Sequence, residues 1–340
     1  MTTPEDRKAL WRQMLRIRLV EERIAELYKN QEMRCPVHLC IGQEAPAVGV
    51  CSRLRREDYV LSTHRSHAHY LAKGGDLKAM LAELYGRADG CCRGKGGSMH
   101  LLDLAVGFLG ATPIVGSTIA IAVGAAFGSV LRGDKRVTVA FFGDAACEEG
   151  VFYESLNFAL LKSLPVVFVC ENNLYSVYSG LSVRQPGGRK IFQLARGCGV
   201  ESAQSDGNDV LAVAELAARA VAKARSGGGP SFLEFKTYRW REHCGPAYDN
   251  DLGYRTQREF QDWRRRCPVA ALREHLRADG ALDDAEAARA EREMLSEIDA
   301  AVRSARKSPP PAPDQLLKGI YAGATATRKR IGGRKRCRAN

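Results

Sequence analysis

The chain has 340 residues, of which 45% are hydrophobic and 26% are charged, a composition typical of a globular protein with one large core or two modest ones. No apolar run approaches the roughly 20 residues that a membrane-spanning helix needs, and the N-terminal sequence lacks the apolar segment of a secretion signal, so we exclude a membrane protein and expect a cytoplasmic one. The net charge of +12 raises nucleic acid as a partner, but seven of the cations lie between residues 328 and 338, and the rest of the chain is only mildly basic.

The eleven cysteines follow no metal-binding pattern. No Cys-x-x-Cys pair exists that could begin a zinc site. Cys147 and Cys170 fall in predicted core segments, where cysteine behaves as a small hydrophobe. We therefore expect reduced thiols, as in a reducing compartment.

The first part of the chain predicts helices with one short strand between them. Residues 4–30 carry apolar side chains at helical spacing, and 42–54 and 76–85 are further predicted helices. A short strand begins at Val60 and runs into a polar loop. A glycine-dense loop follows over residues 90–100.

The middle of the chain predicts a βαβ unit behind a helix of small residues. That helix is expected over 114–131, where alanine and glycine allow close packing of the backbone. Two short runs of β-branched and aromatic residues, 136–142 and 164–170, are typical of buried parallel strands. Residues 149–162 are the predicted crossover helix between them.

The last third predicts two helices, 208–224 and 284–306, with a strand over 231–239 between them. Asp284 is the candidate N-cap of the second helix. A short apolar segment over 316–321 precedes the basic end of the chain.

The order of these elements predicts an α/β fold with a mainly parallel sheet and helices on both faces. We expect a single domain over residues 1–324, with an N-terminal helical arm and a C-terminal extended segment. A basic disordered tail is predicted over residues 325–340.

Polar side chains follow both strands of the βαβ unit. Asp144 comes after the first strand and Asn173 after the second, and the carboxyl ends of such strands form the edge where open α/β sheets bind ligands. A carboxylate and a carboxamide supply the oxygen ligands that magnesium prefers. The backbone amides of Ala145 and Ala146 and the helix start behind them would face phosphate oxygens. The simpler alternative is a helix cap at Asp144 and a turn at Asn172-Asn173.

Four further clusters place polar residues beside the predicted strand ends. They cover residues 38–45, 64–69, 94–100 and 239–243 and contain six of the seven histidines. A lone histidine is more commonly a surface or hydrogen-bonded residue than a catalyst, but six histidines in these clusters favour a function. The arginines among them have a fork that matches phosphate geometry.

The segment from Gly143 to Asn173 resembles the thiamine diphosphate signature, in which Gly-Asp-Gly is followed further along the chain by Asn-Asn, although Ala145 replaces the second glycine. With the other clusters in matching order, the chain from about residue 22 to residue 321 resembles the alpha subunit of the thiamine diphosphate-dependent first component of 2-oxo acid dehydrogenase complexes, of the pyruvate and acetoin types. Residues 94–115 are most similar to the acetoin type. The resemblance implies the thiamine diphosphate-binding fold.

The resemblance also implies a set of ligands for the metal and for the aminopyrimidine ring of the cofactor. Magnesium would be held by the side chains of Asp144 and Asn173 and by the carbonyl of Tyr175. The main chain at Pro113 and Val115 would contact the ring.

The same resemblance assigns the diphosphate and substrate contacts. Arg65 would bind the diphosphate with His64 beside it, and Arg239 and His243 would lie on a loop over the cofactor. His38 would lie near the substrate, which makes the three histidines the candidate catalytic residues.

Two partners are implied by the resemblance. The glutamate that activates thiamine comes from a beta subunit in this family, and 340 residues suffice for one α/β domain rather than for both halves of the site. We therefore expect a heterotetramer with a beta chain, which decarboxylates a 2-oxo acid and passes the acyl group to a lipoyl-bearing transacylase.

Two alternatives stay open from the sequence. A transketolase-like or acyl-carrier-loading half of a biosynthetic enzyme would keep thiamine without lipoamide. A nucleic-acid-binding protein would use the basic tail, and its binding would fall steeply with salt; we do not expect nucleic acid as a partner.

Overall fold

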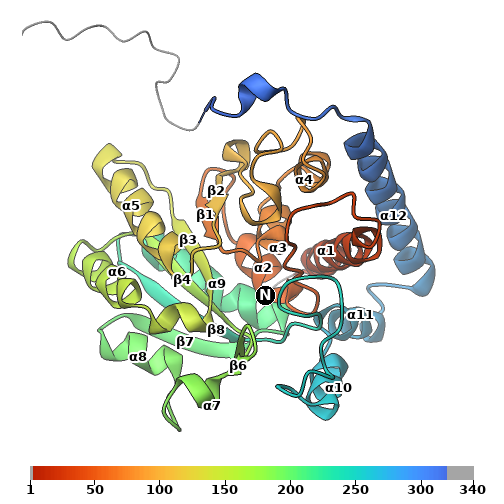
Figure 1. Cartoon of the computed structure of the whole chain (residues 1–340). Helices are drawn as coiled ribbons and strands as arrows, with labels where there is room; N and C mark the ends of the chain where they lie inside the picture. Colours follow the sequence, from red (N-terminus) through yellow and green to blue (C-terminus); the bar gives the residue numbers. More distant parts are fainter. Residues whose placement is uncertain (1–2, 320–340) are drawn as a thin grey trace, which may run out of the picture.

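The computed structural model describes residues 3–319 (Figure 1). Three expectations lie outside the described residues and stay predictions: the tail over 325–340, the domain boundary at residue 324 and the end of the apolar segment at residues 320–321.

A six-stranded sheet forms the centre of the molecule (Figure 1). Its strand order is β2-β1-β3-β4-β8-β7, and every pair of neighbours is parallel. The strands are β1 (Tyr59–Ser62), β2 (Phe108–Ala111), β3 (Thr138–Gly143), β4 (Val166–Asn172), β7 (Glu201–Asp206) and β8 (Ser231–Lys236). A small antiparallel hairpin, β5 (Tyr175–Ser176) with β6 (Ser179–Gly180), follows β4.

Helices cover both faces of the sheet, as the sequence predicts. One face carries α5 (Ser117–Arg132), α6 (Gly150–Leu161) and α8 (Ile191–Gly197). The other face is covered by more helices (Figure 1): α1 (Pro4–Tyr28), α2 (Glu44–Cys51), α3 (His67–Ala72), α4 (Leu77–Leu84), α9 (Val210–Arg225), α11 (Pro268–Ala278) and α12 (Asp284–Lys307). The short helices α7 (Leu181–Arg184) and α10 (Gln257–Arg265) lie at the periphery.

The strand sequences divide their side chains between two cores. Val139 and Phe141 of β3 belong to the core beneath α1, α2 and α9, whereas Ala140 and Phe142 belong to the core beneath α5 and α6. Because successive residues of a strand point to opposite faces, a strand buried on both sides is apolar at every position. This explains the continuous apolar runs of β3 and β4.

Several sequence-based boundaries differ from the structure, and two of the differences have a clear physical cause. The helix predicted from residue 114 begins at Ser117, because Gly116 has a φ of +82° and Ser117 closes a turn on the Ile114 carbonyl. Asp283, not Asp284, caps α12: its backbone is extended and its side chain accepts from the Glu286 amide at 2.6 Å. The strands β2 and β7 and the helices α3, α7, α8, α10 and α11 were not predicted.

Two expectations from composition can be compared with residues 3–319. Within this range no helix combines the length and the apolar character needed to cross a membrane. All ten cysteines in this part of the chain are free thiols.

Candidate functional site

The site lies where β3 and β4 end side by side. In their parallel register Gly143 pairs with Glu171, so the chain leaves the sheet at the same edge just before Asp144 and just before Asn173. This places a carboxylate and a carboxamide at neighbouring strand ends, the arrangement that the spacing predicts.

A cavity of about 220 Å³ opens at this edge. Most of the residues predicted for the site line it, although they come from distant parts of the chain: His38, His64, Arg65, Pro113, Val115, Asp144, Ala145, Ala146, Asn173, Tyr175 and His243. Arg239 is the predicted residue that is absent from the lining.

Asp144 is a buried carboxylate that already has a cation beside it. It is only 2% exposed, and Arg184 of α7 donates to its Oδ2 atom and, at 2.5 Å, to Glu148. Burial raises the pKa of Asp144 despite the opposing charge of Arg184. A second cation would therefore stabilise the charged form of this group.

Asn173 is fixed by two hydrogen bonds. Its Nδ2 donates to Gln43 Oε1 at 3.0 Å, and its Oδ1 accepts from the Tyr175 amide at 3.3 Å. The turn that follows contains Leu174 and Val177, which both have left-handed backbones with φ of +75° and +54°. This tight hairpin brings Tyr175 and Val177 to the cavity wall.

Three histidines that line the cavity lie close to one another; we call His38, His64 and His243 the histidine cluster. Their ring centroids are 4.6 to 5.3 Å apart. Burial, followed by the charge of Arg65, lowers the pKa of His38 to about 2 and those of His64 and His243 to about 3. All three imidazoles are therefore neutral near pH 7.

Arg65 connects the segments that carry this cluster. Its Nη1 donates to the Leu39 carbonyl at 2.6 Å and its Nη2 to the His243 carbonyl at 3.1 Å. Burial, followed by the charge of Arg239, lowers its pKa to about 10. The guanidinium remains a cation at neutral pH and lines the cavity.

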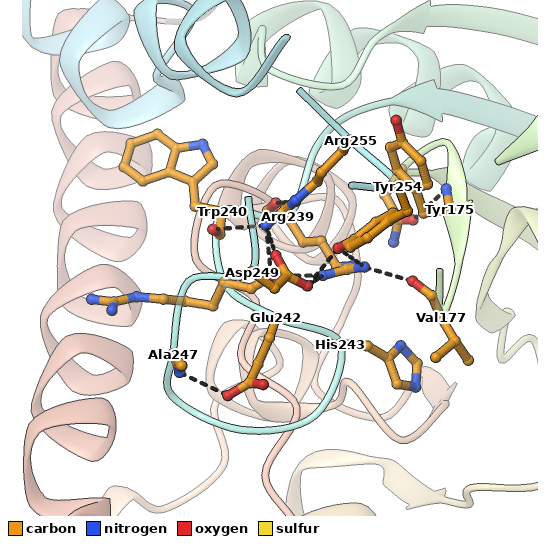
Figure 2. A network of polar contacts seen from close by, with 12 residues as sticks. Tyr175, Val177, Arg239, Trp240, Glu242, His243, Ala247, Asp249, Tyr254 and Arg255 are labelled. Carbon is orange, nitrogen blue, oxygen red and sulfur yellow. Dashed lines mark hydrogen bonds and ion pairs between the residues drawn. The ribbon is translucent and has the colours of Figure 1, made fainter. Parts of the chain in front are cut away.

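Arg239 holds the loop that carries His243 (Figure 2). Its Nη2 donates to the Val177 carbonyl at 2.7 Å and to the Tyr254 hydroxyl at 2.8 Å, and its Nη1 lies 3.4 Å from Asp249 Oδ2. Arg255 donates to the other oxygen of Asp249. Arg239 is fully buried in this network, so it supports the cavity wall from behind.

The remaining predicted contacts are backbone groups. Ala145 and Ala146 lie in a 3-10 turn over Asp144–Glu148 that leads into α6. Ala145 is not among the residues with positive φ in the described chain, so alanine is compatible with its backbone. Pro113 and Val115 lie on the loop between β2 and α5.

The glycine-dense loop is organised by one buried carboxylate. Glu83 accepts from the amides of Cys92 and Gly94 on Oε2 and from those of Gly96 and Gly97 on Oε1, at 2.7 to 3.0 Å. The loop brings Met99 to the cavity.

His67 and His69 lie behind the cavity and support its structure. Both are buried. His67 lies 2.7 Å from Ser98 Oγ and 2.5 Å from Glu21, and His69 stacks on Phe141. They belong to the core rather than to the cavity wall.

Sequence reasoning missed several polar neighbours of the site, among them Glu171, Gln43 and Arg184. Glu171 lines the cavity, and its place in Glu171-Asn-Asn at the end of a strand was a usable signal. Gln43 contacts Asn173 and falls in the polar cluster 38–45, although it was not singled out there. Arg184 contacts Asp144 through tertiary packing, for which the local sequence carries no signal.

Comparisons with known proteins identify the family of the chain. The profile of the family described as "Dehydrogenase E1 component" matches residues 12–314. The pyruvate dehydrogenase E1 component subunit alpha-3, chloroplastic, of Arabidopsis thaliana is 38% identical over 99% of this chain and 79% of its own length. The alpha subunits of acetoin:2,6-dichlorophenolindophenol oxidoreductase from Bacillus subtilis and Cupriavidus necator are also 38% identical, over 93% and 94% of this chain and 94% and 96% of their own lengths.

Proposed function

Because the chain belongs to the dehydrogenase E1 component family, we propose that it is the alpha subunit of a thiamine diphosphate-dependent 2-oxo acid dehydrogenase acting on pyruvate, acetoin or a related substrate. The observation that carries the proposal is the convergence of eleven predicted site residues on one cavity at the ends of β3 and β4. Its relatives at 38% identity are alpha subunits of pyruvate- and acetoin-oxidising enzymes.

The donor set fits a magnesium ion. Asp144 and Asn173 offer a carboxylate and an amide oxygen, and the carbonyl of Tyr175 would be the third protein ligand; all three residues line the cavity. The buried Asp144 carboxylate needs a cation nearby, and burial raises its pKa in the presence of Arg184 alone. Magnesium would add charge where the carboxylate is least solvated.

The cationic and hydrogen-bonding groups that line the cavity fit an anionic group such as a diphosphate. Arg65 provides a buried cation, and His64 and His243 would donate N–H groups to phosphate oxygens. The amides of Ala145 and Ala146 precede the start of α6, where a helix favours negative charge. Arg239 would act by holding the His243 loop, and His38 would face the substrate.

When bound, thiamine diphosphate supplies the carbanion chemistry that 2-oxo acid decarboxylation requires. The chain would orient the diphosphate end, with Pro113 and Val115 facing the aminopyrimidine ring through their main chain. The wall formed by the histidine cluster, in which His38 is buried and His64 and His243 are half-buried, would keep water from the reacting atoms.

The small size of the site supports a partner chain. Ligand pockets that enclose a small molecule measure about 300–1,000 Å³, whereas this cavity measures about 220 Å³. Beside it, α5 and α6 present large apolar side chains to solvent, including Ile121, Leu131 and Leu161. Such a surface is typical of a protein interface, and a beta subunit completing a heterotetramer would cover it and supply the activating glutamate.

The test is reconstitution with the beta chain. The complex should reduce an artificial electron acceptor with one of a panel of 2-oxo acids or acetoin, and the chain alone should be inactive. Acyl transfer to lipoamide would be measured separately with a lipoyl-bearing transacylase. Activity of the chain alone would contradict the proposal that this chain supplies only half of the active site.

Asp144→Asn tests the metal assignment by calorimetry. It should weaken magnesium-dependent cofactor binding by more than about tenfold, because a charged ligand is lost. Glu154→Gln, which changes an exposed carboxylate on α6, is the matched control. Wild-type affinity in the Asp144 variant would refute the metal site.

The alternatives are not favoured by the relatives, which are named as pyruvate dehydrogenase and acetoin oxidoreductase subunits. A nucleic-acid role would depend on residues outside the described chain. The free thiols of residues 3–319 agree with a reducing compartment such as the cytoplasm.

A further inference from the structure

We propose that the adjacent thiols of Cys91 and Cys92 are a reversible oxidation site, at which a peroxide joins the two sulfurs in a disulfide and thereby loosens the glycine-dense loop. Neither cysteine lines the cavity. The inference goes beyond the proposed function and rests on the geometry of this loop.

The two sulfurs lie close together and within reach of solvent. The Sγ atoms of Cys91 and Cys92 and a carboxylate oxygen of Glu83 all lie within 4.8 Å of one another. Both cysteines are half-buried. The Cys92 Sγ atom also lies 2.7 Å from the His100 carbonyl oxygen. An accessible thiol with a second thiol beside it is typical of a redox-sensitive cysteine.

The two thiols differ in acidity and therefore in role. A hydrogen bond from Cys92 lowers the pKa of Cys91, and the same hydrogen bond raises the pKa of Cys92. The charge of Glu83 opposes the lowering at Cys91, but four backbone amides bind that carboxylate. Cys91 is therefore the thiolate that attacks the oxidant, and Cys92 is the thiol that resolves the intermediate.

The oxidation consumes one equivalent of a peroxide. The Cys91 thiolate attacks one peroxide oxygen, the O–O bond breaks and hydroxide leaves, which gives a sulfenic acid at Cys91. The Cys92 sulfur then attacks the Cys91 sulfur, the S–O bond breaks, and water leaves with the thiol proton. Overall the two thiols lose two electrons and two protons, and the peroxide is reduced to water.

The disulfide should be easy to reduce again. The Cα atoms of adjacent residues are about 3.8 Å apart across a trans peptide, whereas ordinary disulfides join Cα atoms roughly 4.4–6.8 Å apart. The bond between Cys91 and Cys92 therefore closes a strained ring. Strained disulfides are the labile kind that a thiol reductant opens.

The strain would act on the loop that reaches the cavity. The Cys92 amide donates to Glu83 at 2.8 Å, so a shift of this peptide weakens one of the four bonds that hold the loop. Further along the loop, Ser98 lies 2.7 Å from His67 Nε2 and Met99 lines the cavity. Oxidation is therefore expected to loosen the loop, and the resulting loss of cofactor affinity rests on the proposed function.

Another pair of neighbouring thiols does not suit the same chemistry. Cys147 and Cys170 have sulfurs 3.9 Å apart, but both side chains are fully buried. Burial also raises the pKa of each. An oxidant in solvent therefore meets the Cys91 thiolate first.

The experiment is oxidation of the reduced full chain with a small excess of hydrogen peroxide, followed by alkylation, trypsin digestion and mass spectrometry. The tryptic peptide 88–93 has Cys91 and Cys92 as its only cysteines, so it should become lighter by two hydrogen atoms and resist alkylation. Dithiothreitol should restore both thiols. Cys92→Ser should leave a sulfenic acid at Cys91 that dimedone traps. Cys198→Ser removes an exposed thiol and should form the disulfide like the wild type.

Limited trypsin digestion of the folded chain measures the effect on the loop. Oxidation should speed cleavage after Arg93 and Lys95 by more than about threefold, and dithiothreitol should reverse the change. An unchanged cleavage rate in the disulfide form would overturn the loosening of the loop.

Three results of the mass analysis would overturn the oxidation site itself. The first is free thiols at Cys91 and Cys92 in a chain whose Cys198 is oxidised. The second is a sulfenic acid at Cys91 that persists in the wild type, and the third is a disulfide formed only between Cys147 and Cys170. None of these readouts depends on the thiamine assignment, which is tested separately by reconstitution with the beta chain.

Discussion

Replacing Glu83 by glutamine should destabilise the glycine-dense loop. In the wild-type protein the two carboxylate oxygens accept four backbone amides at 2.7 to 3.0 Å, with the side chain fully buried. Glutamine keeps one oxygen and turns an NH2 group toward two amides, which then lose their acceptor. At about 1.5–3 kcal/mol for each charge-assisted bond, the loss is about 3–6 kcal/mol.

The net effect should be smaller than this sum. Glutamine avoids the cost of burying a charge, and water can reach the half-buried loop, so we expect about 2–4 kcal/mol of lost stability. The assay is urea unfolding followed by circular dichroism. Trypsin provides a local readout, because Arg93 and Lys95 are exposed within the loop and should be cleaved faster in the variant.

Glu154→Gln on the surface of α6 is the matched control and should change neither measurement. If Glu83→Gln lost less than about 0.5 kcal/mol, as surface substitutions do, and its loop resisted trypsin like the wild type, the carboxylate would not organise the loop.

Three further changes have outcomes fixed by the structure. Arg184→Gln should lower the free energy of unfolding in urea by about 3 kcal/mol, because it leaves the buried Asp144 carboxylate without its cationic partner. Added magnesium should restore part of this stability, and equal stability of the variant with and without magnesium would contradict the pairing of Asp144 with a cation. The histidine cluster has pKa values of about 2 to 3 in the folded chain and 6.5 as its ordinary value. Between these pKa values the unfolded chain therefore binds more protons than the folded chain. The urea midpoint should fall as the pH drops below about 6.5, and it should fall less in a variant that lacks one of these imidazoles. Gly49→Ala should cost about 1–3 kcal/mol through overpacking, because its methyl would lie 2.6 Å from Val213 Cγ1; an unchanged midpoint would show that α2 and α9 can separate.

The parallel sheet and the cavity edge were predictable because the signals were local. β3 and β4 contain the continuous apolar runs 139–142 and 166–170, and Asp144 and Asn173 follow directly after the strands end. Two strands were harder to predict: β7 is largely polar, and β2 is only four residues long with a glycine inside. Neither has the apolar run or the regular alternation by which a strand is detected.

The supporting contacts of the site could not be predicted for a different reason. Arg184 reaches Asp144 over 40 positions of sequence and Gln43 reaches Asn173 over 130. Such pairs depend on how the loops pack after the sheet has formed. The supporting role of Arg239 also depends on tertiary structure. Because its guanidinium is buried, it donates to a backbone carbonyl rather than to a ligand, and the local sequence does not indicate this burial.

The bridge from Arg239 to the Val177 carbonyl joins two segments that are 62 positions apart. It connects the hairpin after β4 to the segment that carries His243. Asp249 stabilises this connection through its contacts with Arg239 and Arg255. Freezing a residue's backbone costs about 1–2 kcal/mol, and here that cost is met during folding rather than on ligand arrival. A ligand therefore binds to a cavity wall that is already rigid. A substitution of Asp249 should weaken ligand binding although Asp249 itself makes no contact with the ligand.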